Sequence, residues 1–524
     1  MNNGQTFQRA VKWAYSMNWG EKGFSALFAF VLASILGPRD FGTVAMAMVY
    51  VSFIQMFLDQ GLLVALVQRK DLQREHLDAV FWMDLVASVL LVAVTMALSK
   101  WWAAINHLPE LALVIAALSI MVPIEGLSVV QRAVLQREMD FKSLSVRSNI
   151  SVLIGGTVGL AMAFKGLGVW ALVGQRISQD ISALALLWSL SHWRPRWRFS
   201  LKHLKELFGF STASFAAKLA VFGNLQSDAF LMGIFFGPVA VGLYRLADRL
   251  MNLVLDGATN SLQIVSLSQF SKVQDNPSEL RKTALSCIRI SATLTLPALA
   301  GLAAVSNPLM AAIGPKWAPT ADVLKILCGL GMALVFLNFT GPLVTALSRP
   351  RFMAVLEWVR TATGAVMLMA VSLLLRDATV RGQVVGVAVL RFVVGGMIFT
   401  PIFLFVLMRF CRIALKDLVA VVTPPACAAA ATATVLTALS LSGLLGGFKP
   451  IVLVAAETTV GGLVAGAILL ALDRQLRAFI FGLVSKVLRH DGSRGTGEVP
   501  YKPLVDPLDP LDSAVARSSS QKQL

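Results

Sequence analysis

The sequence predicts an all-α polytopic membrane protein with about 14 transmembrane helices, and its composition, apolar runs and loop charges support this class. Of its 524 residues, 56% are hydrophobic and 14% are charged, whereas a soluble domain has about 25% charged residues. The mean hydropathy is +0.71. Apolar residues gather in runs of about 20, the length of helix that crosses the hydrocarbon core of a bilayer. A soluble protein of ordinary composition is therefore excluded.

A hydropathy window of about 19 residues locates the individual spans. Fourteen helices are predicted near residues 16–36, 42–68, 79–99, 108–130, 148–164, 168–190, 207–236, 239–265, 283–306, 321–346, 353–375, 383–408, 415–443 and 450–472. The basic, amphipathic segment 473–490 follows them, and we expect it to lie on the membrane surface. The stretch 491–524, rich in Pro, Ser and Asp, is predicted to be a disordered cytoplasmic tail.

Basic residues are divided unequally between the two sets of predicted loops. With the N-terminus inside, the cytoplasmic segments carry 30 Lys and Arg and the opposite loops carry seven. Because cytoplasmic loops concentrate Lys and Arg, this asymmetry places both termini in the cytoplasm. A net charge of +17 would suggest a nucleic-acid partner for a soluble protein, but here it is better explained by loops that meet anionic lipids.

A short internal repeat divides the chain into two halves. The motif GPRDFG at 37–42 returns as GPVAVG at 237–242, and each copy forms a tight external turn between two long helices. Six helices per half is an even number, so both halves insert in the same orientation, with a binding site expected between them near the midplane. The predicted organisation is a pair of pseudo-symmetric six-helix bundles (1–190 and 207–410), a basic cytoplasmic linker (191–206) and two additional helices (411–472).

Charged residues inside the predicted spans are the candidates for a functional site. Nine are basic, and each would cost about 3 kcal/mol if it faced lipid at the bilayer centre. The candidates for a cationic, anion-binding lumen are Lys22, Arg176, Lys218, Arg245 and Arg249. Acidic candidates for ion coupling, or for pairing with these cations, are Glu21, Asp59, Asp228, Asp248 and Asp256. The alternative is that Glu21–Lys22 and Asp248 with Arg245 or Arg249 are internal pairs that only hold helices together.

Five stretches carry a resemblance to a known family. They are ILGPRDFGTVAMA (35–47), FLDQGLLVALVQRKDL (57–72), LQREMDFKSLSVRS (135–148), GLGVWALVGQRISQDI (166–181) and SDAFLMGIFFGPVAVGLYRLADRL (227–250). These stretches resemble the Wzx-type lipid-linked oligosaccharide flippases, the polysaccharide transport branch of the multidrug/oligosaccharidyl-lipid/polysaccharide exporter superfamily. The likeness is greatest to the colanic acid and succinoglycan exporters, over roughly residues 5–440.

The resemblance implies a transporter in the bacterial inner membrane. Such proteins carry undecaprenyl-diphosphate-linked repeat units to the periplasmic leaflet by alternating access, for exopolysaccharide or lipopolysaccharide biosynthesis. The partners implied are the lipid-linked oligosaccharide, anionic membrane lipids, and a polysaccharide polymerase with its co-polymerase. No nucleic acid is expected to bind.

Three other functions stay open on the sequence alone. A drug/cation antiporter of the same superfamily would need a small acidic cavity, which the basic residues inside the spans disfavour. A membrane enzyme, such as a polymerase or an acyltransferase, would be expected to show a large external loop or an intramembrane His, and neither is predicted. A transport-inactive scaffold for polysaccharide assembly is the third. No catalytic residue, cofactor or metal site is predicted, because all five His lie in or next to loops.

Overall fold

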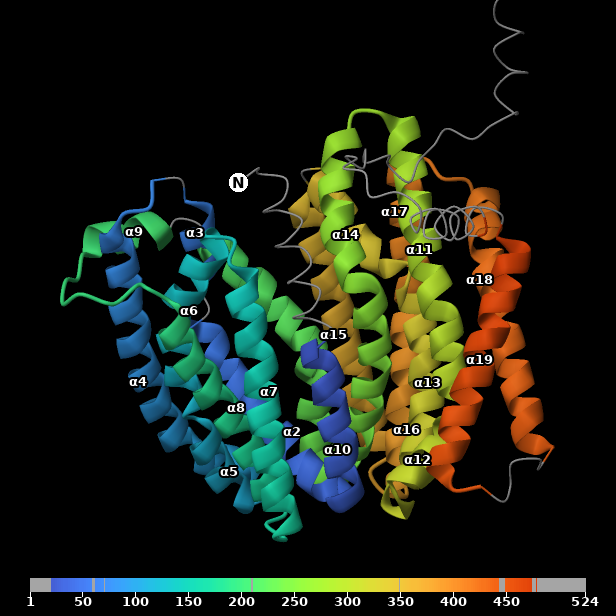
Figure 1. Cartoon of the computed structure of the whole chain (residues 1–524), viewed down its shortest axis with the longest axis horizontal. Coiled ribbons are helices and arrows are strands. Elements are labelled where there is room, and N and C mark those ends of the chain that lie inside the picture. Colours follow the sequence, from blue (N-terminus) through green and yellow to red (C-terminus); the bar gives the residue numbers. More distant parts are fainter. Residues whose placement is uncertain are drawn as a thin grey trace, which may run out of the picture. The chain divides into compact units, whose positions relative to one another are not determined.

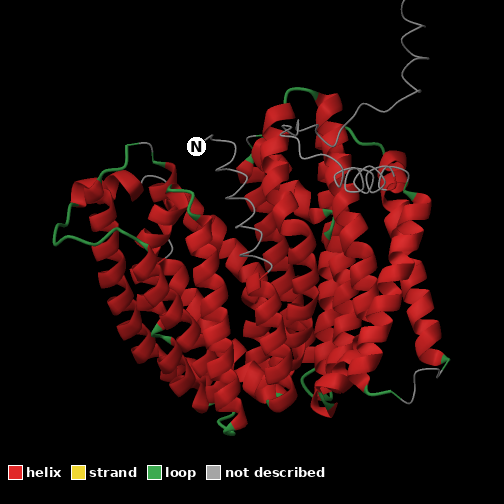
Figure 2. Cartoon of the chain, viewed as in Figure 1, coloured by secondary structure: helices red, strands yellow, loops and turns green. Residues whose placement is uncertain are grey.

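The computed structural model describes residues 20–58, 62–69, 71–208, 211–347, 349–442, 448–473 and 477. By its internal contacts the chain divides into two compact units, Met1–Leu472 and Asp473–Leu524. All the labelled elements lie in the first unit, and among the described residues they are helices without a strand (Figure 2). The predicted all-α class is confirmed. Except for Asp473 and Arg477, the predicted surface segment 473–490 and tail 491–524 lie outside the described residues.

The first described helix covers 20–35. The helices that follow, many of them labelled in Figure 1, are α2 (Pro38–Leu58), α3 (Leu62–Gln68), α4 (Arg74–Ile105), α5 (Glu110–Leu118), α6 (Met121–Arg137), α7 (Phe141–Phe164), α8 (Val169–Leu190), α9 (Leu201–Phe208), α10 (Ser211–Val273), α11 (Pro277–Ala304), α12 (Ser306–Ile313), α13 (Ala318–Leu334), α14 (Thr340–Ala346), α15 (Pro350–Leu374), α16 (Val380–Arg391), α17 (Thr400–Cys411), α18 (Leu415–Leu441) and α19 (Pro450–Leu472). A π-helical stretch, Phe392–Phe399, joins α16 to α17.

Eleven helical stretches in the described part of the chain are long and apolar enough to cross a membrane, judged by length and composition. One of them, Phe222–Gly257, contains Gly237, whose φ of +77° breaks α10 between two predicted spans. The helix at 20–35 is described only from Gly20 onward. The chain is therefore a multi-pass membrane protein, and the predicted number of fourteen spans is compatible with these helices.

Two helices at one end of the first half are longer than predicted. We call the end of the molecule where residues 191–200 lie the linker end. The opposite end carries the turns at Gly37 and Gly237, and we call it the Gly-Pro end. Helix α6 continues to Arg137 instead of ending near 130, and α7 begins at Phe141 instead of 148. Helix α7 starts early because the Asp140 carboxylate caps it, accepting from the backbone N–H of Ser143 at 3.1 Å and from its hydroxyl at 2.6 Å.

Other predicted boundaries are corrected by breaks in the helices. The predicted span 42–68 is two helices, because α2 ends at Leu58 and α3 begins at Leu62, with 59–61 outside the described residues. The predicted span 321–346 divides into α13 and α14; Pro342 lies in the first turn of α14, where its missing N–H is tolerated. The predicted linker 191–206 contains the first residues of α9.

The two copies of the Gly-Pro repeat pack against each other where α2 meets α10. A Cβ added to Gly42 would lie 1.7 Å from the carbonyl oxygen of Pro238. A Cβ added to Gly242 would lie 1.9 Å from the carbonyl oxygen of Pro38. The contact is reciprocal, as expected when a two-fold relation brings the same surface of each repeat to the interface. Only glycine permits two backbones to approach this closely.

Apolar packing joins the halves at the Gly-Pro end and stays within each half at the linker end. The largest buried cluster includes Val49 of α2 and Val241 of α10, so it crosses from one half to the other. At the linker end, one cluster around Val80 belongs to the first half. A second cluster around Phe270 belongs to the second half. The apolar contacts between the halves thus include those at the Gly-Pro end and extend along α2 and α10 as far as the rings of Phe53 and Phe222, whose centroids are 5.6 Å apart.

Candidate functional site

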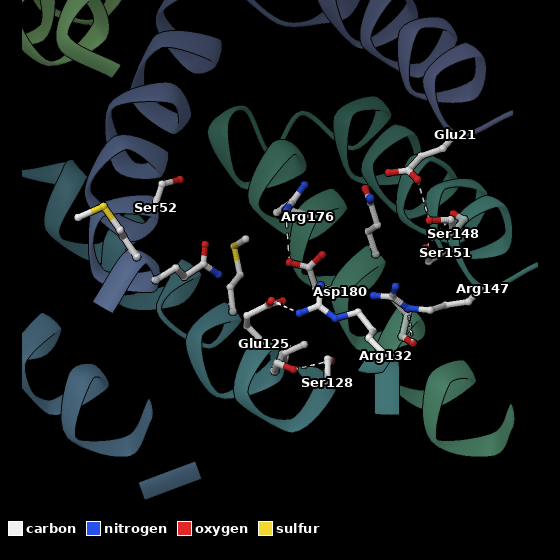
Figure 3. Close-up of a pocket in the computed structure, with 16 residues that line it drawn as sticks. Glu21, Ser52, Glu125, Ser128, Arg132, Arg147, Ser148, Ser151, Arg176 and Asp180 are labelled. Carbon is white, nitrogen blue, oxygen red and sulfur yellow. Dashed lines mark hydrogen bonds and ion pairs between the residues drawn. The ribbon is translucent and has the colours of Figure 1, made fainter. Parts of the chain in front are cut away.

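A cavity of about 510 Å³ lies within the first half of the chain. Helices from five parts of that half line it, and Figure 3 shows charged side chains from several of them turned toward one another. The lining residues are Glu21, Ser52, Gln55, Met56, Met121, Ile124, Glu125, Ser128, Arg132, Arg147, Ser148, Ser151, Arg176, Gln179, Asp180 and Ala183. Most of these side chains are polar, so water and polar ligands are the natural occupants of the cavity.

Two of the three cavity arginines are paired with carboxylates of their own helices. Arg176 Nε lies 3.3 Å from Asp180 Oδ2, one turn farther along α8. Arg132 donates to Glu125 Oε1, two turns earlier on α6. The spacing of these residues sets both pairs locally, because side chains three, four or seven positions apart share one face of a helix.

Arg147 differs from the other two arginines. Its Nε donates to the carbonyl oxygen of Ala183 at 3.3 Å, and no carboxylate of a described residue lies within ion-pair distance of its guanidinium. Nearby, Glu21 Oε2 accepts from the Ser148 hydroxyl at 2.7 Å. A guanidinium that holds only a carbonyl keeps several N–H donors for another acceptor. Arg147 is therefore the cavity cation best placed to bind an anionic ligand.

Sequence reasoning had found only part of this cavity. Of its charged residues, Glu21 and Arg176 were predicted candidates, whereas four others were missed: Glu125, Arg132, Arg147 and Asp180. Arg132 and Arg147 were assigned to a cytoplasmic loop, but the longer α6 and α7 place both inside helices. The Asp-x-x-Ser cap at Asp140 was the local signal that would have moved Arg147 into a helix.

Two predicted cations lie between the halves and not among the residues that line the cavity. Lys22 Nζ lies 2.8 Å from Asp256 Oδ2 of α10, although 234 residues separate them in sequence. Arg249 Nη2 donates to the hydroxyl of Ser25 at 2.6 Å and to its carbonyl oxygen at 3.2 Å. The helix at 20–35 is therefore tied to α10 by polar contacts. The alternative Glu21–Lys22 pair is not seen, because each residue has another partner.

Charges of the second half form a partly buried network, in which the charged side chains are between 6% and 28% exposed. The Asp228 side chain is only 6% exposed; its Oδ2 forms an ion pair with Arg391 Nε at 2.8 Å and accepts from the Tyr244 hydroxyl at 3.0 Å. Arg245 lies 3.6 Å from Asp248, the pair that the structural alternative anticipated. Arg245 also donates to Gln226, and Asn252 donates to Asp248 at 3.0 Å. Every charge in this network thus has a partner within the protein.

Two remaining candidates cannot be placed. Asp59 lies outside the described residues, and so does the side chain of Lys218. On α15, Glu357 and Arg360 form another internal ion pair, with Arg360 Nη2 2.7 Å from Glu357 Oε2. Among the described residues no group of three His, Cys, Asp or Glu side chains is arranged to hold a metal ion.

The chain is similar to known proteins in its sequence and in its fold. The succinoglycan biosynthesis transport protein ExoT of Rhizobium meliloti is 27% identical over 326 residues, which are 62% of this chain and 66% of that protein. The match thus spans slightly less than two thirds of that relative. A family model described as "Polysaccharide biosynthesis protein" matches residues 31–322.

Two solved structures share the fold. The lipid II flippase MurJ, in an inward closed conformation, superposes with a TM-score of 0.69 over 89% of this chain and 99% of MurJ, at 13% identity. An inward-facing multidrug resistance MATE family transporter of the MOP superfamily gives a TM-score of 0.57 over 75% of this chain and 95% of its own, at 17% identity. At such low identities these likenesses establish the polytopic fold alone.

The family model covers more than half of the chain, and its range includes the Gly-Pro repeat, every residue of the cavity except Glu21, and the reciprocal glycine contact. The predicted resemblance to polysaccharide exporters is confirmed at the level of the family, and the chain belongs to the polysaccharide biosynthesis protein family.

Proposed function

We propose that this protein is a transporter that moves lipid-linked saccharides across the bacterial inner membrane, with undecaprenyl-diphosphate-linked repeat units as its substrate. The observation that carries the proposal is Arg147, a cation without a carboxylate partner among the described residues, in a polar cavity of about 510 Å³. Membership of the polysaccharide biosynthesis protein family and the fold shared with MurJ support it. In this proposal both termini are cytoplasmic, and the linker end faces the cytoplasm.

The chemistry of the cavity suits a diphosphate joined to a sugar. Guanidinium groups form charge-assisted hydrogen bonds with phosphate oxygens, often two at a time. Serine and glutamine side chains in the same cavity supply neutral partners for sugar hydroxyls. Three arginines face three carboxylates, so the formal charges of the cavity balance. An anion is therefore attracted locally, at Arg147, and not by a large net positive charge.

Alternating access gives the packing of the halves a role. The glycine contact closes the Gly-Pro end, which is the periplasmic end in this proposal, while the apolar clusters of the linker end stay within their own halves. Such an arrangement corresponds to a state that receives substrate from the cytoplasmic leaflet. Release on the other side then requires the two Gly-Pro turns to separate.

The drug/cation antiporter is the second candidate, since the MATE fold is also shared. The cavity as a whole favours neither charge, because its three arginines are balanced by three carboxylates. The preference for an anionic substrate rests on Arg147, which has no carboxylate partner in the described part of the chain, whereas Glu21, hydrogen-bonded to Ser148, is the group that would favour a cation. We also propose a polysaccharide polymerase and its co-polymerase as partners, and family membership is the only support for them.

The test is made in a strain that lacks the gene and carries one variant at a time. Arg147→Ala is expected to lower polymer export roughly 10- to 100-fold, because charge-assisted hydrogen bonds contribute about 1.5–3 kcal/mol. Arg147→Lys should be milder. Complete lipid-linked repeat units should accumulate on the cytoplasmic leaflet. A defect in the synthesis of the repeat unit would instead leave incomplete units.

The matched control is Lys165→Ala, which removes an exposed cation at the other end of the same helix. Its export should equal that of the wild type. Full export by Arg147→Ala at normal membrane abundance would contradict the proposed site. Accumulation of incomplete repeat units in the deletion strain would indicate an enzyme of assembly instead.

A further inference from the structure

The segment between α8 and α9 is folded against the first half and is not a loose tether. The Trp193 side chain is buried in the apolar cluster of the linker end. The backbone N–H of Arg196 donates to Asp78 Oδ1 at 3.1 Å, and its carbonyl oxygen accepts from Trp82 Nε1 at 2.7 Å. The Arg194 guanidinium donates to the carbonyl oxygen of Trp188 at 2.7 Å. These contacts fix the segment to α4 and to the end of α8.

Large apolar side chains of this fixed segment are exposed in the described part of the chain. Trp197 is 89% exposed, Phe199 54% and Leu201 62%. The Trp197 ring lies against the Trp82 ring, with centroids 4.4 Å apart and planes 28° apart, so its orientation is set by the fold. Exposing these apolar side chains to water is unfavourable, because transfer of apolar surface out of water lowers the free energy.

Cations alternate with these apolar side chains. Arg196, Arg198 and Lys202 are all exposed, and none of them forms an ion pair with a described residue. Aromatic and basic side chains together are the composition of protein segments that lie at the boundary between lipid headgroups and acyl chains. We call these three cations, together with Trp197, Phe199 and Leu201, the linker patch.

The position of the linker patch fits that boundary. Helix α4 is one of the membrane-spanning candidates, and Trp82 lies eight residues after its first residue, Arg74. At 1.5 Å per residue, the Trp82–Trp197 contact is about 12 Å along the helix from its end. Figure 1 shows the green segment ahead of α9 running out past α4, on the flank of the first half. None of the patch residues lines the cavity.

We propose that the linker patch is a binding site for anionic phospholipid headgroups of the leaflet at the linker end. Trp197, Phe199 and Leu201 enter the apolar boundary of that leaflet. Arg196, Arg198 and Lys202 bind the phosphate groups, and negative surface potential adds to their attraction. The segment that links the halves is thereby anchored to the bilayer beside the first half. This role is separate from transport chemistry and does not depend on the identity of the saccharide.

The experiment uses the full-length protein, purified in detergent, with dioleoylphosphatidylglycerol as the anionic probe and dioleoylphosphatidylcholine as the neutral one. Native mass spectrometry counts the bound lipids. The wild type should retain the anionic lipid in preference. Arg196→Ala/Arg198→Ala/Lys202→Ala should lower its apparent affinity about tenfold or more. Trp197→Ala should weaken binding of both lipids, because it removes the apolar contact.

A matched triple variant supplies the control: Lys272→Ala/Arg409→Ala/Lys416→Ala removes three exposed cations at the same end of the second half. It should keep the preference for the anionic lipid, and so should Arg147→Ala, which tests the transport site alone. Equal retention of the two lipids by the wild type would overturn the proposal, as would an equal loss in both triple variants. Lost export with unchanged lipid binding in the patch variant would indicate a protein occupant and would also overturn it.

Discussion

The two halves of the molecule use the same kinds of charged residue in opposite ways. In the first half, Arg147 borders a cavity and holds only a carbonyl oxygen. In the second half, Arg391 holds Asp228, whose side chain is almost sealed from solvent and is also bonded to Tyr244. A charge beside a cavity can exchange partners, whereas a sealed pair cannot. The comparison teaches that membrane-embedded charges are assigned to function by what surrounds them and not by residue type.

The largest effect is expected from breaking the sealed pair. Asp228→Ala leaves Arg391, whose side chain is 28% exposed, without the buried carboxylate that it pairs with. Removing one partner of a buried pair costs about 3–5 kcal/mol of stability, and the partial exposure of Arg391 places the expected loss at the lower end of that range. Membrane abundance and the thermal midpoint in detergent should both fall sharply. The double variant Asp228→Asn/Arg391→Gln should recover much of both, because no unpaired charge remains.

The exposed ion pair of Asp322 with Arg381 is the matched control for that variant. Asp322→Ala should change stability by less than about 1 kcal/mol, since exposed pairs contribute little. If Asp228→Ala were as stable as the wild type yet inactive in export, the second-half network would be functional and the contrast between the halves would fail.

A smaller effect is expected at the contact that joins the halves. Gly42→Ala would place a methyl group against the carbonyl oxygen of Pro238, so the Gly-Pro end could not close as it does here. Overpacking of this kind costs about 1–3 kcal/mol. The population of the closed state should fall roughly 5- to 150-fold, measured by distances between spin labels placed on the two halves.

Gly364→Ala on α15 is the control for that substitution, because nothing lies within 4 Å of a Cβ added there. It should leave the label distances unchanged. A Gly42→Ala protein with wild-type distances would mean that the glycine contact does not hold this end closed.

The smallest effect is expected at the half-exposed bridge between the halves. Lys22→Ala removes the ion pair with Asp256, and the two side chains are 29% and 44% exposed. Exposed pairs contribute about 0–1 kcal/mol, so the thermal midpoint should move little. Export should fall by less than in Arg147→Ala. A larger loss in Lys22→Ala, at equal abundance, would move the candidate site from the cavity to the interface.

The fold class could be predicted from sequence because hydropathy is a local property of each helix. The Gly-Pro repeat also marked the two positions that later proved to be in contact, at Gly42 and Gly242. The partner of Lys22 could not be predicted, since Asp256 lies 234 residues away and no local pattern links them. Arg147 was missed for another reason: hydropathy finds the apolar centre of a helix, and caps decide where its polar ends lie.

The central claim is that the first half, through Arg147, binds the phosphate of a lipid-linked saccharide, and that the second-half network does not. The direct measurement is the affinity of purified full-length protein for a lipid diphosphate saccharide in detergent micelles. Arg147→Ala should weaken binding roughly 10- to 100-fold, and Asp228→Asn/Arg391→Gln should bind as the wild type does. Wild-type affinity in Arg147→Ala, or lost affinity only in the folded double variant, would contradict this account.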